Sequence, residues 1–148
     1  HFHIITSPAS RCRLLAEKLV PSPSQDERLA EMDFGDWESH RWDDLRDHPD
    51  FGPYFERWCQ NYLELSCPNG ESYIDLQRRV LEFWADLQQS SQNAVVVTHA
   101  GVIRTLLAHL ENPGSKPNFN LKLHFGEVIA LRSDKNGNMK RLKPNDRT

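Results

Sequence analysis

The sequence predicts an α/β fold in which a mostly parallel sheet carries helices on both faces. Two segments, residues 2–6 and 94–98, are short and apolar, and each leads directly into a segment with helical spacing. Strands that alternate with helices in this way form parallel sheets covered on both sides. Neither an internal repeat nor a linker divides the 148 residues, so we expect a single domain over residues 1–148.

The first strand is expected at residues 2–6, with the sequence FHIIT. Ser7 and Pro8 follow it as the predicted N-cap and first residue of a helix. This helix is expected to run to about Val20, because a Pro-Ser-Pro stretch then ends it. Three leucines are expected on its inward side: Leu14, Leu15 and Leu19.

The middle of the chain predicts a loop, a broken helical region and one long helix. Residues 28–38 are loop-like, and residues 41–65 are aromatic and helical in pieces. A turn at residues 66–70 precedes a helix that Ser72 caps, with Asp75 three residues later. Five residues at helical spacing form the apolar face of this helix: Tyr73, Leu76, Val80, Phe83 and Leu87.

The clearest strand is residues 94–98, AVVVT, which is continuously apolar as a central parallel strand should be. The chain then turns at His99 into another helix. The apolar residues of that helix are Val102, Ile103, Leu106, Leu107 and Leu110. Near the C-terminus, residues 127–132 and 139–142 are expected to pair as a hairpin about Asn136-Gly137, which is a favoured two-residue turn.

Composition and charge exclude several classes of protein. The net charge is −3 and the pI is about 6.2, which does not fit a nucleic-acid-binding surface. No apolar run approaches the roughly 20 residues of a membrane-spanning helix. The cysteines lack metal or redox spacing, so we expect reduced thiols in a cytoplasmic protein, packed as small apolar side chains. They are Cys12, Cys59 and Cys67.

Two strand-to-helix junctions carry candidate anion-binding residues. His99 follows residues 94–98, and Arg11 lies in the first turn of the helix after residues 2–6. The carboxyl ends of parallel strands are where such sheets bind ligands, and helix N-termini favour anions. Arginine is the side chain best shaped to bind phosphate. The ordinary alternatives are a helix-capping role for His99 and a solvated surface position for Arg11. Arg13 is expected at the surface.

The loop at residues 28–38, RLAEMDFGDWE, is a third candidate element. A carboxyl group held against apolar side chains has a raised pKa, which suits a general acid. Four acids lie among the apolar residues of this loop: Glu31, Asp33, Asp36 and Glu38. Composition does not single out one of the four, and simple solvation is the alternative for each.

These stretches resemble the histidine phosphatase superfamily, which has the phosphoglycerate-mutase-like fold, and in particular its α-ribazole phosphatase branch. The resemblance is carried by TSPASRCRLLAEKL, RLAEMDFGDWES and VVVTHAGVIRTLL, with weaker agreement in PNGESYIDLQRRV and FNLKLHFGEVIAL. Together they span nearly the whole chain in the family's order. The resemblance implies a three-layer α/β sandwich that hydrolyses a small phosphomonoester, with α-ribazole 5′-phosphate of cobalamin biosynthesis as the particular substrate.

Residue by residue, the resemblance implies three catalytic positions. Arg11 matches the family's phosphate-binding arginine, Glu31 its proton-donating acid and His99 its second active-site histidine. The amide of Ala100 would help to hold the phosphate. The reaction is implied to pass through a phosphohistidine, without a metal ion or another cofactor. Neither nucleic acid nor a membrane is expected as a partner, and a homodimer is left open.

The chain departs from the family in one respect. The family's first strand ends in Arg-His-Gly, which supplies the nucleophilic histidine, and this tripeptide does not occur in the 148 residues. The sequence opens at His1 without a methionine and enters a strand at once. Loss of a central strand would leave backbone groups unpaired in the interior, which is costly. We therefore expect the missing strand upstream of His1, and negligible turnover from the 148 residues alone.

Other functions stay open. One is a broad-specificity phosphatase or a phosphoglycerate-mutase-like phosphotransferase, and another is a non-catalytic phosphate-binding module that lacks the nucleophile. A set of aromatic residues would either roof the pocket over an aromatic substrate or, as is more ordinary, pack the helical region: Trp42, Phe51, Tyr54, Phe55, Trp58 and Tyr62. His1 and His3 could share a ligand on one side of a strand, although a structural role is the ordinary explanation.

Overall fold

The computed structural model describes residues 2–90, 92–134, 136 and 138–142. The chain divides into two compact units, of which the first ends at Ile103 and the second begins at Arg104. The expectation of a single domain over residues 1–148 stays a prediction. Helix α5 (Ala100–Glu111) includes the residue at which the first unit ends.

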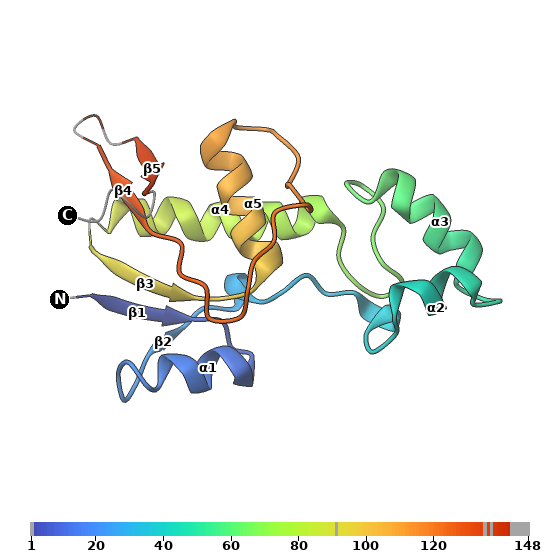
Figure 1. Cartoon of the computed structure of the whole chain (residues 1–148), viewed down its shortest axis with the longest axis horizontal. Coiled ribbons are helices and arrows are strands. Elements are labelled where there is room, and N and C mark those ends of the chain that lie inside the picture. The colour runs from blue at the N-terminus through green and yellow to red at the C-terminus, as the bar shows by residue number, and fades with distance from the viewer. Residues whose placement is uncertain (1, 91, 135, 137, 143–148) are drawn as a thin grey trace. The chain divides into compact units, whose positions relative to one another are not determined.

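Parallel strands form the sheet of the first unit, in the order β2-β1-β3. The strands are β1 (His3–Thr6), β2 (Ser24–Gln25) and β3 (Ala94–Val97). Figure 1 shows α1 (Ser10–Ala16) and α4 (Tyr73–Gln89) on opposite sides of these strands. The predicted α/β fold with a parallel sheet is therefore confirmed.

Strand β3 occupies a different place from the central one that its apolar sequence predicts. Within the part of the chain that the structure describes, β3 pairs with β1 and borders the three-stranded sheet. All four of its residues are half-buried. They are only half-buried because, within the described residues, β3 has a neighbouring strand on one edge and its other edge is unpaired.

Helix α1 differs from its predicted form at both ends. Ala9, not Ser7, is the N-cap, and the helix ends at Ala16. The three leucines predicted to face inward are instead exposed: Leu14 (56%), Leu15 (50%) and Leu19 (56%). The buried side is formed by Cys12 and Ala16, which lie one turn apart. Small side chains let the helix pack closely against β1 and β3, so they decide which face is buried.

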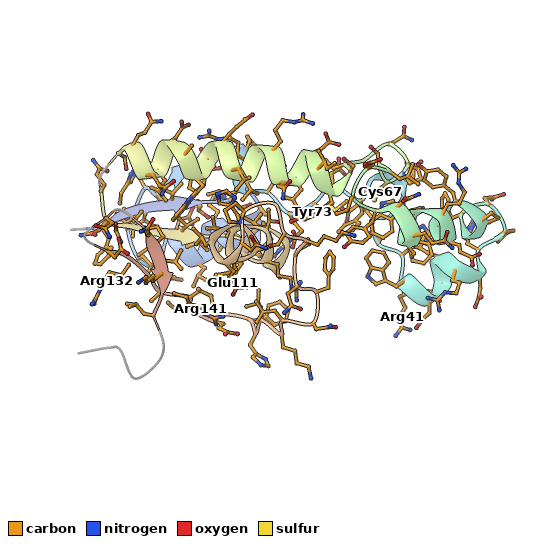
Figure 2. All side chains as sticks on the ribbon, turned by 90° about the horizontal axis from the view of Figure 1, so that it is seen from above. Arg41, Cys67, Tyr73, Glu111, Arg132 and Arg141 are labelled. Atoms are coloured by element: carbon orange, nitrogen blue, oxygen red, sulfur yellow. The ribbon has the colours of Figure 1, made fainter. Side chains whose placement is uncertain are left out.

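Helix α4 matches its prediction closely. The Ser72 side chain accepts from the amide of Asp75, and the Asp75 carboxylate accepts from the amide of Ser72. This reciprocal capping box starts the helix at the predicted residue. Its buried residues are Tyr73, Leu76, Val80, Phe83 and Trp84, so that Trp84 takes the place expected for Leu87. Figure 2 labels Tyr73 at the start of the helix and Cys67 in the turn before it.

The aromatic region folds into short helices that pack on one another. They are the 3₁₀ helices η1 (Glu27–Leu29) and η2 (Gly35–Trp37) and the α-helices α2 (Trp42–Asp47) and α3 (Gly52–Asn61). The rings of Trp37, Phe55 and Trp58 are buried, with centroids of 5.3 to 6.2 Å between them. Packing is therefore the role of these three rings, whereas Trp42 is half exposed.

The second unit contains an antiparallel pair, β4 (Leu131–Ser133) and β5 (Met139–Arg141). The predicted pairing of the two strands is confirmed, but the first strand begins later than residue 127. The amide of Glu127 instead donates to the carbonyl of His124 in a turn. The predicted two-residue turn is wrong, because Ser133 lies opposite Met139 and five residues separate them. Gly137 of the predicted turn lies outside the described residues. Among the helices that the structure describes, none has the length and apolar character to cross a membrane.

Candidate active site

His99 lies between β3 and α5, is 6% exposed, and both of its ring nitrogens have partners. The Nε2 atom lies 2.8 Å from Oγ of Ser7, and Nδ1 lies 2.9 Å from Nη2 of Arg11. Both partners come from the segment that follows β1. The structure therefore brings together the two strand-to-helix junctions that the sequence singled out.

The partners of His99 define the form of its ring. A guanidinium has only donors, so Nδ1 of His99 accepts from Arg11 and Nε2 carries the proton that is donated to Ser7. Burial lowers the pKa of His99 below its ordinary value of 6.5; the Glu31 carboxylate opposes this shift and the Arg11 charge adds to it. A neutral imidazole with the proton on Nε2 satisfies both the hydrogen bonds and this pKa.

Ser7 belongs to the site, although the sequence suggested only a helix cap for it. Its side chain is buried, and its Oγ also accepts from the amide of Ala9 at 3.3 Å. Its own amide donates to the carbonyl of Val97 at 2.9 Å, which joins the ends of β1 and β3. The signal that could have identified Ser7 is its position directly after a parallel strand.

Cys12 packs against the His99 ring from α1. Its Sγ lies 3.6 Å from Nε2 and 3.9 Å from Nδ1. Burial raises the pKa of the Cys12 thiol, although the nearby Arg11 charge opposes this shift. A neutral buried thiol is a poor nucleophile, so its contribution here is packing. Cys67 is also buried and Cys59 is exposed, and all three are free cysteines.

Glu31 reaches the same place from the acidic loop. Its Oε2 accepts from the amide of Gly101 at 3.2 Å, two residues beyond His99, and its Oε1 accepts from the amide of Met32 at 3.1 Å. A Cβ atom at position 101 would collide with this carboxylate. Glycine at the start of α5 is therefore what lets the acid lie against the helix N-terminus.

The structure separates Glu31 from the other three acids of its loop. Asp33 accepts from the amide of Gly35, and Glu38 accepts from the amide of Phe34. Asp36 accepts from the side chain of Asn69. These three side chains are exposed and support the loop itself. Of the four, it is Glu31 that lies next to His99 and Gly101.

The remaining predicted positions lie as follows. Ala100 begins α5 immediately after His99, and its contact with phosphate stays a prediction. Arg13 is partly exposed and pairs with Glu17 at 2.9 Å, as expected for a surface charge. The Nε2 of His3 lies 2.9 Å from Oγ of Ser24 on β2, whereas His1 lies outside the described residues. Among the described side chains, no three His, Cys, Asp or Glu residues cluster as metal ligands would.

Two further residues beside the site, Glu71 and Arg79, were not singled out by the sequence. Arg79 lies on α4 and donates to the backbone carbonyl of Glu31 at 3.0 Å. It also forms an ion pair with Glu71 at 2.7 Å. Both residues occur in PNGESYIDLQRRV, but an arginine and a glutamate eight positions apart carry no local signal that they meet.

A buried histidine bonded to an arginine thus lies beside an acid at the carboxyl ends of parallel strands, which is where such sheets bind ligands. The model of the histidine phosphatase superfamily (branch 1) matches residues 2–145. The chain belongs to the histidine phosphatase superfamily.

Among its relatives, a Hydrogenobacter thermophilus protein whose name includes phosphoserine phosphatase 2 is 33% identical over 111 residues. That match covers 74% of this chain and 53% of the relative. The adenosylcobalamin/alpha-ribazole phosphatase of Escherichia coli is 37% identical over 100 residues, which cover 66% of this chain and 45% of the relative. The chain thus spans about half the length of the curated relatives that it matches.

Comparison with solved structures identifies the fold as well. The phosphoglycerate mutase of Thermus thermophilus superposes with a TM-score of 0.62 at 27% identity. The superposition covers 97% of this chain and 74% of the mutase. The predicted phosphoglycerate-mutase-like fold is therefore confirmed.

Proposed function

We propose that this chain supplies the phosphate-binding and proton-transfer part of a phosphomonoesterase site. The observation that carries the proposal is the convergence of Arg11, His99 and Glu31 from three separate segments. Arg11 and His99 come from the two strand-to-helix junctions. The Glu31 carboxylate contacts the amide of Gly101, in the first turn of the helix after His99. A phosphate group placed there would meet donors on one side and an acid on the other.

The hydrogen bond between Arg11 and His99 is one that a phosphate dianion could replace. Arg11 donates to Nδ1 of His99, an acceptor that a phosphoryl oxygen would replace with a stronger charge-assisted bond. The dianion would also favour protonation of the buried imidazole, because opposite charges raise the pKa of a histidine. His99 would then donate to the phosphoryl group from a nitrogen that is an acceptor when the site is empty of phosphate.

The proposed reaction is hydrolysis through a phosphohistidine. A nucleophilic histidine, on an Arg-His-Gly strand of the complete protein, attacks phosphorus with a ring nitrogen as the ester P–O bond breaks. Glu31 gives its proton to the leaving alkoxide. Water then attacks the phosphohistidine, Glu31 takes the proton of that water, and the P–N bond breaks to release phosphate. Arg11 and His99 stabilise the charge on the phosphoryl oxygens throughout.

Strand β3 supports a place for that additional strand. Its sequence AVVV is apolar on both faces, yet its residues are half-buried and β1 is its partner in the described sheet. Continuous apolar strands of this kind are typically buried between neighbours. A strand upstream of His1 would pair with the other edge of β3 and bring its Arg-His-Gly end to the carboxyl side of the sheet, next to His99.

The complete protein provides the test. Its coding sequence should contain Arg-His-Gly upstream of His1, and the purified enzyme should hydrolyse an aryl phosphate in excess EDTA. A Glu31→Gln variant should slow esters with poor leaving groups more than esters with good ones, because only the former need the proton. Equal losses on both would remove Glu31 as the acid, and activity abolished by EDTA would contradict a metal-independent reaction.

For the substrate, we propose a phosphomonoester with an aromatic group, such as α-ribazole 5′-phosphate. A cavity of about 100 Å³ is lined by aromatic side chains that include Phe34, Trp37 and Trp42. Phe34 is three residues from Glu31, a length of chain that spans at most about 11 Å. The Trp42 ring stacks against Trp58, with centroids 5.7 Å apart, but it is half exposed, so part of it can contact a ligand. The name of the Escherichia coli relative supports the same substrate, whereas that of the Hydrogenobacter thermophilus relative refers to phosphoserine.

A preference for aromatic esters tests this finer proposal. Replacement Trp42→Ala should lower kcat/KM for α-ribazole 5′-phosphate by roughly 10-fold, the value of one stacking contact, and leave glycerol phosphate unchanged. Phe2→Ala, which removes an exposed ring on another segment, is the matched control. Equal effects of Trp42→Ala on both substrates would instead favour the broad-specificity phosphatase or the phosphoglycerate-mutase-like phosphotransferase.

A non-catalytic phosphate-binding module that lacks the nucleophile is the second candidate, and the pair of Arg11 and His99 supports it because phosphate binding requires no nucleophile. It predicts that the 148-residue chain binds inorganic phosphate, with a shift of the His99 ring signals, but does not turn over an aryl phosphate. A coding sequence that begins at His1 would favour this candidate over the enzyme. Cytoplasmic location and a homodimer of the complete protein also stay predictions.

A further inference from the structure

Arg79 uses every donor of its guanidinium in the described structure. Its Nε donates to Glu71 Oε1 at 2.7 Å, and one Nη2 hydrogen goes to Glu71 Oε2 at 2.8 Å. The other three bonds reach backbone carbonyls of the segment that leads to the candidate acid: Arg28 (2.8 Å), Ala30 (2.7 Å) and Glu31 (3.0 Å). A guanidinium has five N–H groups, and here all five are satisfied.

Glu71 holds the other side of the same segment. Besides Arg79, its Oε2 accepts from the amide of Asp33 at 3.0 Å, and its own amide donates to the Asp33 carbonyl at 2.8 Å. Burial raises the pKa of Glu71, but the bonds from Arg79 and Asp33 outweigh this and leave the pKa below its ordinary value. The carboxylate is therefore charged, and its bonds are charge-assisted.

The two loops are also in close backbone contact. A Cβ atom at Gly35 would strike the backbone of residues 68–70, and one at Gly70 would strike the backbone of residues 33–35. The amide of Asp36 donates to the carbonyl of Pro68 at 2.9 Å. Gly35 has a φ of +54°, which glycine adopts without strain. The loop that carries Glu31 therefore cannot slide along the turn before α4 without breaking these contacts.

We propose that Arg79 and Glu71 are positioning residues, which hold the backbone on both sides of Met32 so that the Glu31 carboxylate stays on the Gly101 amide beside His99. The role of Glu31 as acid and base rests on the function proposed above; the positioning itself rests on the geometry. The competing explanation is a purely structural ion pair. Buried ion pairs are weak evidence for stability on their own, so the two explanations need a measurement that separates them.

The pKa of His99, followed in the complete protein, provides that measurement. The Glu31 carboxylate raises the pKa of His99, so Glu31→Gln should lower it, and this shift calibrates the experiment. Arg79→Lys keeps the positive charge near His99 but loses the planar set of donors. We expect it to lower the His99 pKa, measured by NMR, by a large share of the Glu31→Gln shift, and to change the chemical shift of the Gly101 amide.

Arg78→Lys is the matched control. Arg78 lies next in the sequence, is exposed, and pairs with Asp75 at 2.8 Å, so its replacement should leave the His99 pKa unchanged. If Arg79→Lys lowers the melting temperature but not the His99 pKa, the ion pair is structural and the proposal is overturned. It is equally overturned if Glu31→Gln does not shift His99, because Glu31 is then not held beside the ring.

A second variant covers the case in which Arg79→Lys does not fold, as judged by circular dichroism. Glu71→Gln keeps the shape and one acceptor, and should lower the His99 pKa in the same direction; no shift in a folded Glu71→Gln variant overturns the proposal. In the complete enzyme, each variant should lower kcat for poor leaving groups about 10- to 100-fold, the cost of a small misplacement, with little change in KM. A complete protein without phosphatase activity would refute the proposed function, whereas the NMR result would still decide the positioning.

Discussion

His99 and Glu31 lie side by side but are held in opposite ways. Both nitrogens of His99 bond to side chains, Ser7 and Arg11, which belong to the site itself. The segment of Glu31 is held by its backbone, through Arg79, and its carboxylate touches backbone amides such as that of Gly101. His99 is thus oriented by side chains that a ligand would also contact. Glu31 is oriented by backbone hydrogen bonds that a ligand would not contact.

This difference suits the two proposed tasks. A ligand that binds Arg11 would replace it as the partner of Nδ1 of His99. The Nδ1 atom would then need a proton to donate to the ligand, so the protonation of the His99 ring depends on what Arg11 binds. Glu31 is asked to give one proton and then take one back without moving, and a backbone-held segment keeps its place whether the carboxyl is charged or neutral. Substitutions on the two sides should therefore fail differently.

The largest effect is expected from Arg11→Gln, which changes one of the two side chains that hold His99. It removes the guanidinium beside His99 and should lower kcat/KM of the complete enzyme on an aryl phosphate about 100-fold or more. In the 148-residue chain it should weaken binding of inorganic phosphate, measured through the His99 ring signals. Arg13→Gln, at a partly exposed residue paired with Glu17, should match wild type in both measurements. A loss of the same size in both variants would point to general charge and not to a phosphate site.

Ser7→Ala should have the next largest effect, on the free energy of unfolding. It leaves the Nε2 proton of a buried ring without its acceptor, which costs about 1–3 kcal/mol. Urea denaturation of the complete protein measures this loss. Ser10→Ala, at an exposed position on the first turn of α1, is the control and should cost much less. Equal stabilities of the two variants would mean that Ser7 does not hold His99.

Gly101→Ala tests the backbone contacts that hold Glu31. It should displace the Glu31 carboxylate while changing the free energy of unfolding little. Alanine favours a helix over glycine by about 1 kcal/mol, and this gain offsets the lost Glu31 bond, so the free energy of unfolding should change little. The new methyl group takes the place of the Glu31 carboxylate, which must swing away. The pKa of His99 should then fall as in Glu31→Gln, and combining both substitutions should add nothing. An unchanged His99 pKa in Gly101→Ala would contradict the contact.

The smallest expected effect is a pH dependence of stability from His99. Because its folded pKa lies below the ordinary 6.5, the unfolded chain binds this proton more readily. The free energy of unfolding should therefore decrease as the pH falls below about 6.5, and level off once the folded His99 is protonated too. Denaturation curves from pH 8 to 5, compared with those of His99→Gln, isolate this contribution. Parallel pH profiles of the two proteins would show that His99 is not the cause.

Local signals account for the parts of the fold that the sequence predicted well. Helix α4 starts at its predicted cap because Ser72 and Asp75 satisfy each other's amides within four residues. The strands β1 and β3 were equally readable, since short apolar runs followed by helical spacing need no distant partner to be recognised. The hairpin of β4 and β5 was located, but its first strand was predicted too long.

Tertiary contacts decided what local signals could not. The sequence determined that His99 and Arg11 follow the ends of parallel strands, and the family resemblance singled out Glu31 in the loop at residues 28–38. It did not determine that Ser7 would bond His99 in place of capping α1, or that Cys12, not the leucines, would face the sheet. Each of these outcomes depends on atoms more than 80 residues away along the chain. Composition did not separate Glu31 from the other three acids of its loop. Its contacts with Arg79 and Gly101 do so in the structure, because hydrogen-bond partners brought together by packing leave no periodic pattern in the sequence.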